Sequence, residues 1–245
     1  MALTDMLVYA DTSPACGERL DLSLRLARRF GAYLIAVCPE EAIAVGERFA
    51  KMLRQEDVQG EWEMAVGLPA SYVTRRAQGI DLVILGQRTP DHSTGLDAPQ
   101  EVVLACGRPV LIVPYAGHIE RIGETAIVAW NGSREAARAV QDALPLLSAA
   151  ASVTVFLVNP EEAADIADAH NLVIHLARHG LNAKKLVVRE DILAVSDTVL
   201  AQVAALDADL LVMGAYGHSR LREMILGGVT RDVLRNMNVP VLMSH

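Results

Sequence analysis

The chain contains an internal repeat, and no other feature of the sequence constrains its fold as strongly. Three pairs of apolar segments occur in the same order in the two halves: MLVYADTS with AIVAWNGS, DLVILG with DLLVMG, and RPVLIVPY with VPVLMSH. The first pair begins at Met6 and Ala126, an offset of 120 positions, and the offset reaches 131 between Pro109 and Pro240. Because 245 residues are enough for two domains of ordinary size, we expect two copies of one domain.

Each copy alternates short apolar runs with amphipathic helical patterns, as in βαβ units around a parallel sheet. In the second copy the patterns predict strands at AIVAW, SVTVFLV, KKLVV, DLLVMG and PVLMS, and helices over residues 134–148, 162–179, 194–206 and 229–237. Hydrophobic residues make up 52% of the chain but aromatic residues only 4%, which favours parallel sheets covered by helices. We predict an α/β fold of two tandem doubly wound, five-stranded parallel-sheet domains, Rossmann-like and of strand order 3-2-1-4-5, at residues 1–117 and 124–245.

A serine after the first strand of each copy is expected to cap the helix that follows. Ser13 and Ser133 stand where a side-chain oxygen accepts a hydrogen bond from the first helical N–H groups. Pro14 would take the first helical position, where its missing N–H is not needed. Arg134 and Glu135 then open the helix of the second copy, and both are expected to point to solvent.

Charge and cysteine content exclude several classes of function. The net charge is −8, with 11 basic and 16 acidic side chains in residues 1–120 against 11 and 14 in the remainder, so neither half has the basic excess typical of nucleic-acid binding. Three cysteines without paired spacing indicate reduced, buried thiols. No apolar run approaches the roughly 18 residues of a transmembrane helix, and the first residues lack the pattern of a signal peptide. We expect a cytoplasmic protein without nucleic-acid or membrane partners.

The segment GAYGHSRLREMILGGVT, from Gly214 to Thr230, carries the clearest indication of a binding site. Ligands of doubly wound sheets bind beyond the carboxyl ends of the strands where the winding reverses, and this segment and the loop at Asn131 border that place. Glycines allow backbone N–H groups to approach an anion, the next helix adds unpaired donors, and Arg220 or Arg222 is long enough to reach a terminal phosphate. The segment is neither a P-loop nor the dinucleotide fingerprint, so the glycine pattern alone fits a phosphate cradle and a plain turn equally well.

The repeat unit, with G-x2-G-x9-G after its fourth strand and a hydroxyl residue just beyond, resembles the universal stress protein (UspA-like) family in its tandem form, whose fold is adenine nucleotide alpha hydrolase-like. The resemblance implies that the second domain holds ATP, with or without Mg²⁺, with ribose near Asn131, adenine near Val158 and phosphates in the glycine loop. The residues implied as ligands are Asn131, Val158, Met213, Gly214, Gly217, His218, Arg220, Gly227, Gly228, Val229 and Thr230. Two positions depart from the family pattern, because Gly228 stands where Ser or Thr is usual and Asn131 where Asp is usual.

The first copy keeps the aspartate, Asp11, but not the glycine loop. After Gly86 the chain reads QRTPDHSTGLDAPQEVVLACG, which places Pro90, Asp91 and Asp97 where phosphates would need N–H donors and positive charge. We expect a degenerate first domain that does not bind ATP in the manner of the family. The resemblance also implies that the last strands of the two domains pair as an intramolecular pseudo-dimer, and it is compatible with a homodimer.

Two groups of histidines raise alternatives to simple binding. His175 and His179 lie one helical turn apart and suit zinc if further ligands converge, although a solvated helix face explains them equally well. His218 lies within the glycine loop, where it could contact phosphate or act as an acid or base.

The residues and the resemblance together predict a stress-response protein that binds ATP, or a related adenine nucleotide, and acts through nucleotide-dependent contacts with other proteins. Any hydrolysis would be slow, because the loop contains no Walker lysine and no evident base. Two alternatives stay open. One is an adenylating or ATP-cleaving enzyme that uses His218 or Arg220, and the other is an interaction module that has lost nucleotide binding.

Overall fold

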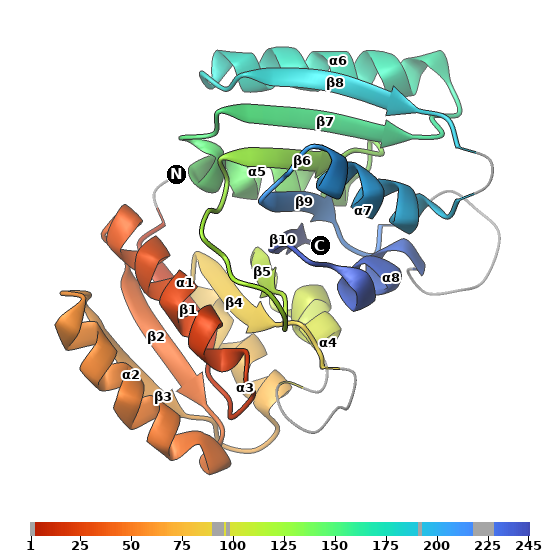
Figure 1. Cartoon of the computed structure of the whole chain (residues 1–245). Coiled ribbons are helices and arrows are strands. Elements are labelled where there is room, and N and C mark those ends of the chain that lie inside the picture. Colours follow the sequence, from red (N-terminus) through yellow and green to blue (C-terminus); the bar gives the residue numbers. More distant parts are fainter. Residues whose placement is uncertain (1–2, 90–95, 97–98, 191–192, 218–227) are drawn as a thin grey trace. The chain divides into compact units, whose positions relative to one another are not determined.

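The computed structural model describes residues 3–89, 96, 99–190, 193–217 and 228–245 of the chain. The chain divides into two compact units, Met1–Ile119 and Glu120–His245, each built of parallel strands covered by helices (Figure 1). Within each unit the described strand pairings are all parallel. The α/β class predicted from the repeat is therefore confirmed.

The first unit contributes five strands in the order β3-β2-β1-β4-β5. The strands are β1 (Asp5–Tyr9), β2 (Tyr33–Cys38), β3 (Gly60–Met64), β4 (Leu82–Gly86) and β5 (Val110–Val113). The helices are α1 (Cys16–Phe30), α2 (Ile43–Gln55), α3 (Pro69–Arg76) and α4 (Pro99–Ala105), with 3-10 turns η1 (Glu40–Ala42) and η2 (Ala77–Gly79). This is the predicted order 3-2-1-4-5, with the first strand in the centre.

The second unit repeats the arrangement, with the order β8-β7-β6-β9-β10. The strands are β6 (Thr125–Ala129), β7 (Ser152–Val158), β8 (Ala183–Val188), β9 (Leu210–Gly214) and β10 (Val241–Ser244). The helices are α5 (Arg134–Leu147), α6 (Ala163–Arg178), α7 (Val195–Ala205) and α8 (Gly228–Asn236). Each predicted helix agrees with the observed one to within one residue at either end.

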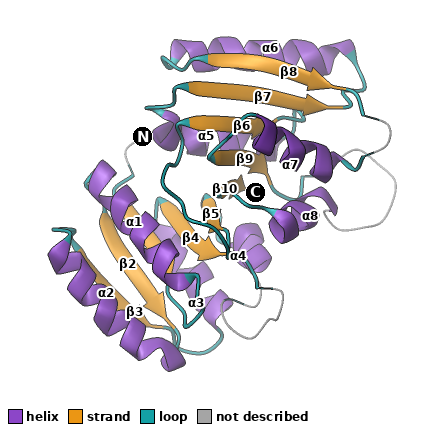
Figure 2. Cartoon of the chain, viewed as in Figure 1, coloured by secondary structure: helices purple, strands orange, loops and turns teal. Residues whose placement is uncertain are grey.

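Helices cover both faces of the second unit's sheet, as Figure 2 shows: α5 and α6 lie on one face, and α7 and α8 on the other. The central strands are consequently buried on both sides. Ile127 and Val212 have no exposed surface, and Val128 is 1% exposed. A strand enclosed in this way needs a continuous apolar run rather than alternating residues, which accounts for the composition of the chain.

The two units differ at the start of the first helix. Ser133 caps α5 as predicted, because its hydroxyl oxygen accepts a hydrogen bond from the N–H of Ala136 at 3.1 Å. The matching prediction for the first unit is wrong, since α1 begins only at Cys16 and neither Ser13 nor Pro14 starts it. Ser13 instead donates its backbone N–H, at 2.9 Å, and its hydroxyl to the carboxylate of Asp11. The hydrogen bond from the hydroxyl to this charged carboxylate is stronger than the bond that its oxygen would accept from a helix N–H group.

The three cysteines are free and buried, as expected. Burial raises the pKa of the Cys16 thiol and raises that of Cys38 to about 12, so neither forms the reactive thiolate at neutral pH. In the described ranges, no helix combines the length and the apolar character needed to cross a bilayer.

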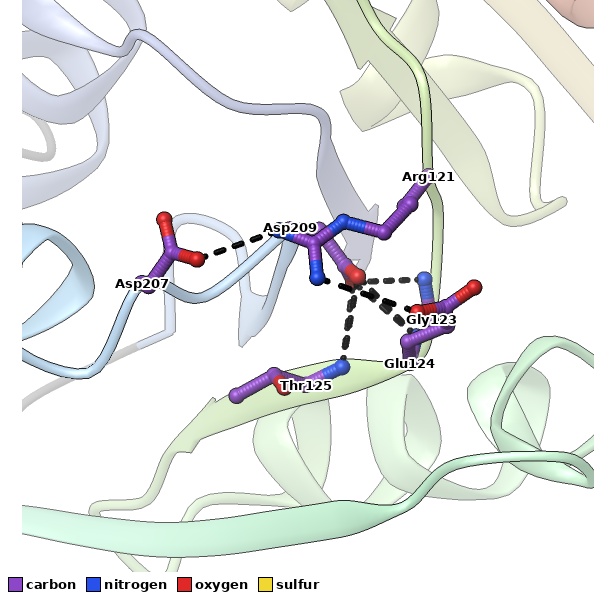
Figure 3. A network of polar contacts seen from close by, with 6 residues as sticks. All are labelled: Arg121, Gly123, Glu124, Thr125, Asp207 and Asp209. Atoms are coloured by element: carbon purple, nitrogen blue, oxygen red, sulfur yellow. Dashed lines mark hydrogen bonds and ion pairs between the residues drawn. The ribbon is translucent and has the colours of Figure 1, made fainter.

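An aspartate at the same position of each repeat fastens the first strand of its unit. Asp209, just before β9, accepts the backbone N–H groups of residues 123–125 at 2.7 to 3.3 Å (Figure 3). Asp81, just before β4, accepts those of Thr4 and Asp5 at 2.8 and 3.1 Å. Burial raises the pKa of the Asp209 carboxyl despite its bonds. In each unit, one carboxylate therefore holds the chain segment that enters the central strand.

Replacing Asp209 by alanine removes the acceptor of these buried N–H groups. We expect Asp209→Ala to lower the free energy of unfolding by about 2 kcal/mol, measured by urea denaturation. The matched control is Asp207→Asn, two positions away. The Asp207 side chain is 92% exposed, its ion pair with Arg121 lies at the surface, and asparagine tolerates its φ of 47°. The control should lose less than about 0.5 kcal/mol, and equal losses in the two variants would contradict the role given to Asp209.

Candidate functional site

The carboxyl edge of the second sheet brings together residues that are distant in the sequence. In the strand register, Ala129 of β6 faces Phe156 of β7 on one side and Met213 of β9 on the other. Asn131 follows Ala129 by two positions, and Val158 follows Phe156 by two positions. Because the strands are parallel, Asn131, Val158 and the residue after Met213 reach the same edge, where the winding of the sheet reverses.

The residue after Met213 is Gly214, and it packs directly against the first turn of α5. A Cβ atom added to Gly214 would lie 2.5 Å from the backbone nitrogen of Ala136 and 2.6 Å from the carbonyl carbon of Glu135. These are backbone atoms, so a side chain could be accommodated only by moving the helix. The glycine thus lets the N-terminus of α5, with its partial positive charge, lie directly against the start of the loop.

Gly217 lies against the same helical turn. A Cβ atom at Gly217 would lie 2.9 Å from Oε2 of Glu135 and 3.4 Å from the hydroxyl oxygen of Ser133. Glu135 is only 3% exposed, so the expectation that it points to solvent is wrong. The Arg134 side chain, by contrast, is 77% exposed. The approach of Gly217 covers Glu135, which a single sequence does not reveal.

The pKa of Glu135 is lowered although its side chain is buried. Burial acts to raise the pKa of this carboxyl, but the hydrogen bonds from Nε of Arg134 and from its own backbone N–H, together with the Arg134 charge, outweigh burial and hold the pKa below its usual value. The ion pair with Arg134 also fixes the carboxylate beneath Gly217. A negative charge therefore lies at the base of the loop, neutralised by a guanidinium at the surface.

The described part of the glycine loop is tied to the elements on both sides of it. Tyr216 has a φ of 53°, in the left-handed region that a residue with a side chain rarely adopts, and its N–H donates to the hydroxyl oxygen of Thr230 at 3.3 Å. Thr230, in α8, is 4% exposed. Nδ1 of His245 lies 3.0 Å from the carbonyl oxygen of Ala215. These contacts join the loop to α8 and to the residue after β10.

The loop after β6 presents polar groups at the same edge. Asn131 is exposed, and its carbonyl oxygen accepts the N–H of Ser133 at 3.1 Å. Gly132 has a φ of 71°, which favours glycine there. The preceding residue, Trp130, has its indole nitrogen buried without a hydrogen-bond partner in the described structure. A buried N–H without an acceptor is costly, and a bound molecule with an acceptor atom would satisfy it.

The remaining predicted ligands are placed as follows. Gly228 and Val229 open α8, and Val229 is 39% exposed. Met213 is buried within β9, and Val158, the last residue of β7, is half-buried. His218, Arg220 and Gly227 lie outside the described residues.

The residues present fit an adenine nucleotide on observations of this structure. Gly214 and Gly217 hold the glycine loop directly against the first turn of α5, near the partial positive charge of that helix end and with no side chain between them. Asn131 offers an amide, Val158 an apolar surface, and Trp130 an unsatisfied donor. Sequence reasoning missed Glu135 and His245, which only the fold brings to the loop. It also missed Tyr216, which stands within the loop but is not one of its glycines, and Trp130, whose burial the sequence does not reveal.

The histidine pair on α6 lacks further ligands in the described ranges. The rings of His175 and His179 stack edge to face with centroids 4.6 Å apart. Among the described residues, no group of three or more His, Cys, Asp and Glu side chains gathers in a way that could hold a metal ion.

Comparisons with known proteins identify the family of the second unit. Residues 124–245 match the model of the Universal stress protein family, so this half of the chain is a domain of that family. A universal stress protein from Synechocystis sp. is 56% identical over 34 residues, which are 14% of this chain and 12% of that protein.

Solved structures resemble the whole chain. A universal stress protein from Archaeoglobus fulgidus DSM 4304 has a TM-score of 0.80 and 17% identity, and the match covers 98% of this chain and 95% of that one. A putative universal stress protein from Pseudomonas aeruginosa has a TM-score of 0.67 and 18% identity, with 99% and 93% covered. These likenesses show that both halves share the fold of those proteins.

The two glycines that bracket the loop should respond differently to a methyl group. Gly214→Ala forces the first turn of α5 away from β9, so we expect it to lower the free energy of unfolding by about 2 kcal/mol. Gly228→Ala meets no atom of the described residues within 4 Å and should leave stability unchanged or raise it by up to about 0.5 kcal/mol. Chemical denaturation measures both. A tolerated Gly214→Ala would contradict the close approach of the helix.

The stability contributed by Glu135 should depend on pH. Because its folded-state pKa is lowered, the contribution is present above the unfolded-state pKa of about 4.3 and is lost as the pH falls through the folded-state value. Glu135→Gln should therefore be less stable than wild type by about 1 kcal/mol at pH 7, and this gap should narrow as the pH is lowered from about 6 to about 3.5. A gap that is independent of pH would show that Glu135 acts through its shape rather than its charge.

Proposed function

We propose that the second unit binds ATP, or a related adenine nucleotide, at the carboxyl edge of its sheet. The observation that carries the proposal is the close packing of Gly214 and Gly217 against the first turn of α5, which places a loop free of side chains at those positions beside the partial positive charge of a helix N-terminus. Membership of the second unit in the Universal stress protein family supports the same ligand class.

Each part of the nucleotide has a group to meet it. The amide of Asn131 would bind the ribose hydroxyls, and the half-buried Val158 would pack against the base. Backbone N–H groups of the glycine loop and the start of α8 would bind the phosphates, and Mg²⁺, when present, would neutralise part of their charge. Asn131 is a neutral acceptor, which bonds hydroxyls more weakly than a carboxylate, and Gly228 offers no hydroxyl. We therefore expect a modest affinity.

The site favours binding over turnover. The one carboxylate that the described structure places beneath the loop, Glu135, is fixed by Arg134 rather than free to take a proton from water. We propose that the protein acts in the cytoplasm in the response to stress, as a nucleotide-dependent regulatory protein whose contacts with other proteins change with nucleotide occupancy.

Thermal unfolding with and without millimolar Mg²⁺-ATP tests the proposal. A ligand at 100 times its dissociation constant adds about 2.7 kcal/mol, so the midpoint of wild type should rise by roughly 5–10 °C. Gly217→Asp places a second carboxylate beside Glu135 and in the path of the phosphates, so this variant should show no rise. The control Gly79→Asp adds the same charge at an exposed glycine of η2, where an added Cβ atom has no neighbour within 4 Å in the described part of the chain, and it should respond like wild type.

Two outcomes would overturn the proposal in different ways. A cooperatively folded wild type that gains no stability from ATP would leave the second unit as an interaction module without a nucleotide. An equal rise in wild type and Gly217→Asp would place the nucleotide away from the glycine loop.

A further inference from the structure

In the first unit an internal ion pair occupies the carboxyl edge of the sheet. Arg19, in α1, is 2% exposed, and Asp11, after β1, is 3% exposed. Nη2 of Arg19 donates to Oδ2 of Asp11 at 2.7 Å, and its Nε donates to the carbonyl oxygen of Tyr9 at 2.8 Å. The other oxygen of Asp11 accepts the N–H and the hydroxyl of Ser13. Both carboxylate oxygens are thus engaged within the unit.

Arg19 lies where the first turn of the helix lies in the second unit. Gly86 ends β4 as Gly214 ends β9, and a Cβ atom at Gly86 would lie 2.1 Å from Nη1 of Arg19 rather than against helix backbone. The helix α1 begins at Cys16, two positions later in the repeat than α5, which begins at Arg134. Because α1 begins later, no helix backbone lies beside Gly86, and the guanidinium of Arg19 fills this space.

The two copies of the repeat differ at the position of this arginine. At the offset of 120 that aligns Asp11 with Asn131, Arg19 aligns with Ala139, which is fully buried. A long cation therefore stands in the first copy where the second has a small apolar residue. A guanidinium suits this position because its planar fork donates to the Asp11 carboxylate and the Tyr9 carbonyl at once, which a lysine ammonium cannot reproduce.

We propose that Arg19 is a built-in ligand of the first unit, in which its guanidinium takes the hydrogen bonds and the space that an external ligand would need. The chain accordingly binds nucleotide in its second unit only, a consequence that rests on the function proposed above. The ligand class that this place accepts is a small planar cation with several N–H donors, since its wall is formed by a buried carboxylate and a backbone carbonyl.

Chemical rescue tests the built-in ligand without any nucleotide. Arg19→Ala leaves the Asp11 carboxylate buried and unpaired, so we expect the thermal midpoint to fall by roughly 10 °C. N-ethylguanidinium at about 20 mM should enter the vacated space and raise the midpoint of this variant by a few degrees. The double variant Arg19→Ala/Asp11→Asn lacks the anionic partner and should gain nothing from the cation.

The control is an arginine on the same helix that is also ion-paired but exposed. Arg28 pairs with Glu56 at 2.6 Å, with side chains 59% and 46% exposed. Arg28→Ala should lower the midpoint by less than about 3 °C and show no rescue. Equal response of the Arg19 and Arg28 variants to the cation, or rescue that persists without the Asp11 carboxylate, would overturn the proposal. If Arg19→Ala does not fold, Arg19→Lys, which keeps the charge but loses the fork, should fold with a lowered midpoint, and an unchanged midpoint would overturn it.

Equilibrium dialysis with ATP tests the consequence for stoichiometry. Wild type should bind one nucleotide per chain, and Gly217→Asp none. A nucleotide that still binds to Gly217→Asp, at the place in the first unit that the Arg19 guanidinium fills, would contradict the proposal that this place is already occupied. Absence of ATP binding by wild type would refute the proposed function alone, because the rescue experiment decides on Arg19 independently.

Discussion

The close packing of β9 against the first turn of α5 governs what the carboxyl edge of the second unit can do. At Gly214 the end of β9 lies so close to α5 that an added Cβ atom would collide with the helix backbone. At Gly217 the loop lies over the side chain of Glu135. A side chain at either position would separate the loop from the helix N-terminus, and so from the partial positive charge that makes such a terminus attractive to anions. The glycine spacing matters because of this contact rather than for flexibility alone.

The two units share one structural framework but fill the space at the carboxyl edge of the sheet in different ways. Both have the same strand order, the same aspartate before the fourth strand and a glycine at that strand's end. They differ in how the space beside this glycine is filled, by helix backbone in the second unit and by the Arg19 guanidinium in the first. The buried guanidinium of Arg19 is tolerated in the first unit because Asp11 provides a buried partner of opposite charge. Without that partner, burial of the charge would be costly.

The sequence was sufficient to predict the strand order and the strands and helices of the second copy, since hydrophobic periodicity reports burial and three pairs of segments recur in the two halves. The site was only partly predictable. The glycines and Thr230 follow from the motif, but Glu135 stands in a first helical turn, where glutamate is normally solvated, and only the approach of Gly217 buries it. The late start of α1 was missed because Ser13 and Pro14 form a good capping pattern. The hydrogen bonds of Ser13 to the Asp11 carboxylate, which replace the cap, become evident only in the folded structure. One signal was available: an arginine in the first copy aligns with an alanine in the second.

The contacts around the loop also indicate how nucleotide occupancy would reach the rest of the unit. The N–H of Tyr216 is bound to the hydroxyl of Thr230, so the strained loop residue is held by the first turn of a helix that begins at Gly228. The carbonyl of Ala215 meets His245 after β10. A phosphate drawing the loop N–H groups toward itself would compete with the Thr230 contact and shift α8, which packs against α7. Because α7 and α8 together cover one face of the sheet, a small rearrangement at the loop would alter a helical surface rather than a single side chain, and such a surface is what a protein partner would read.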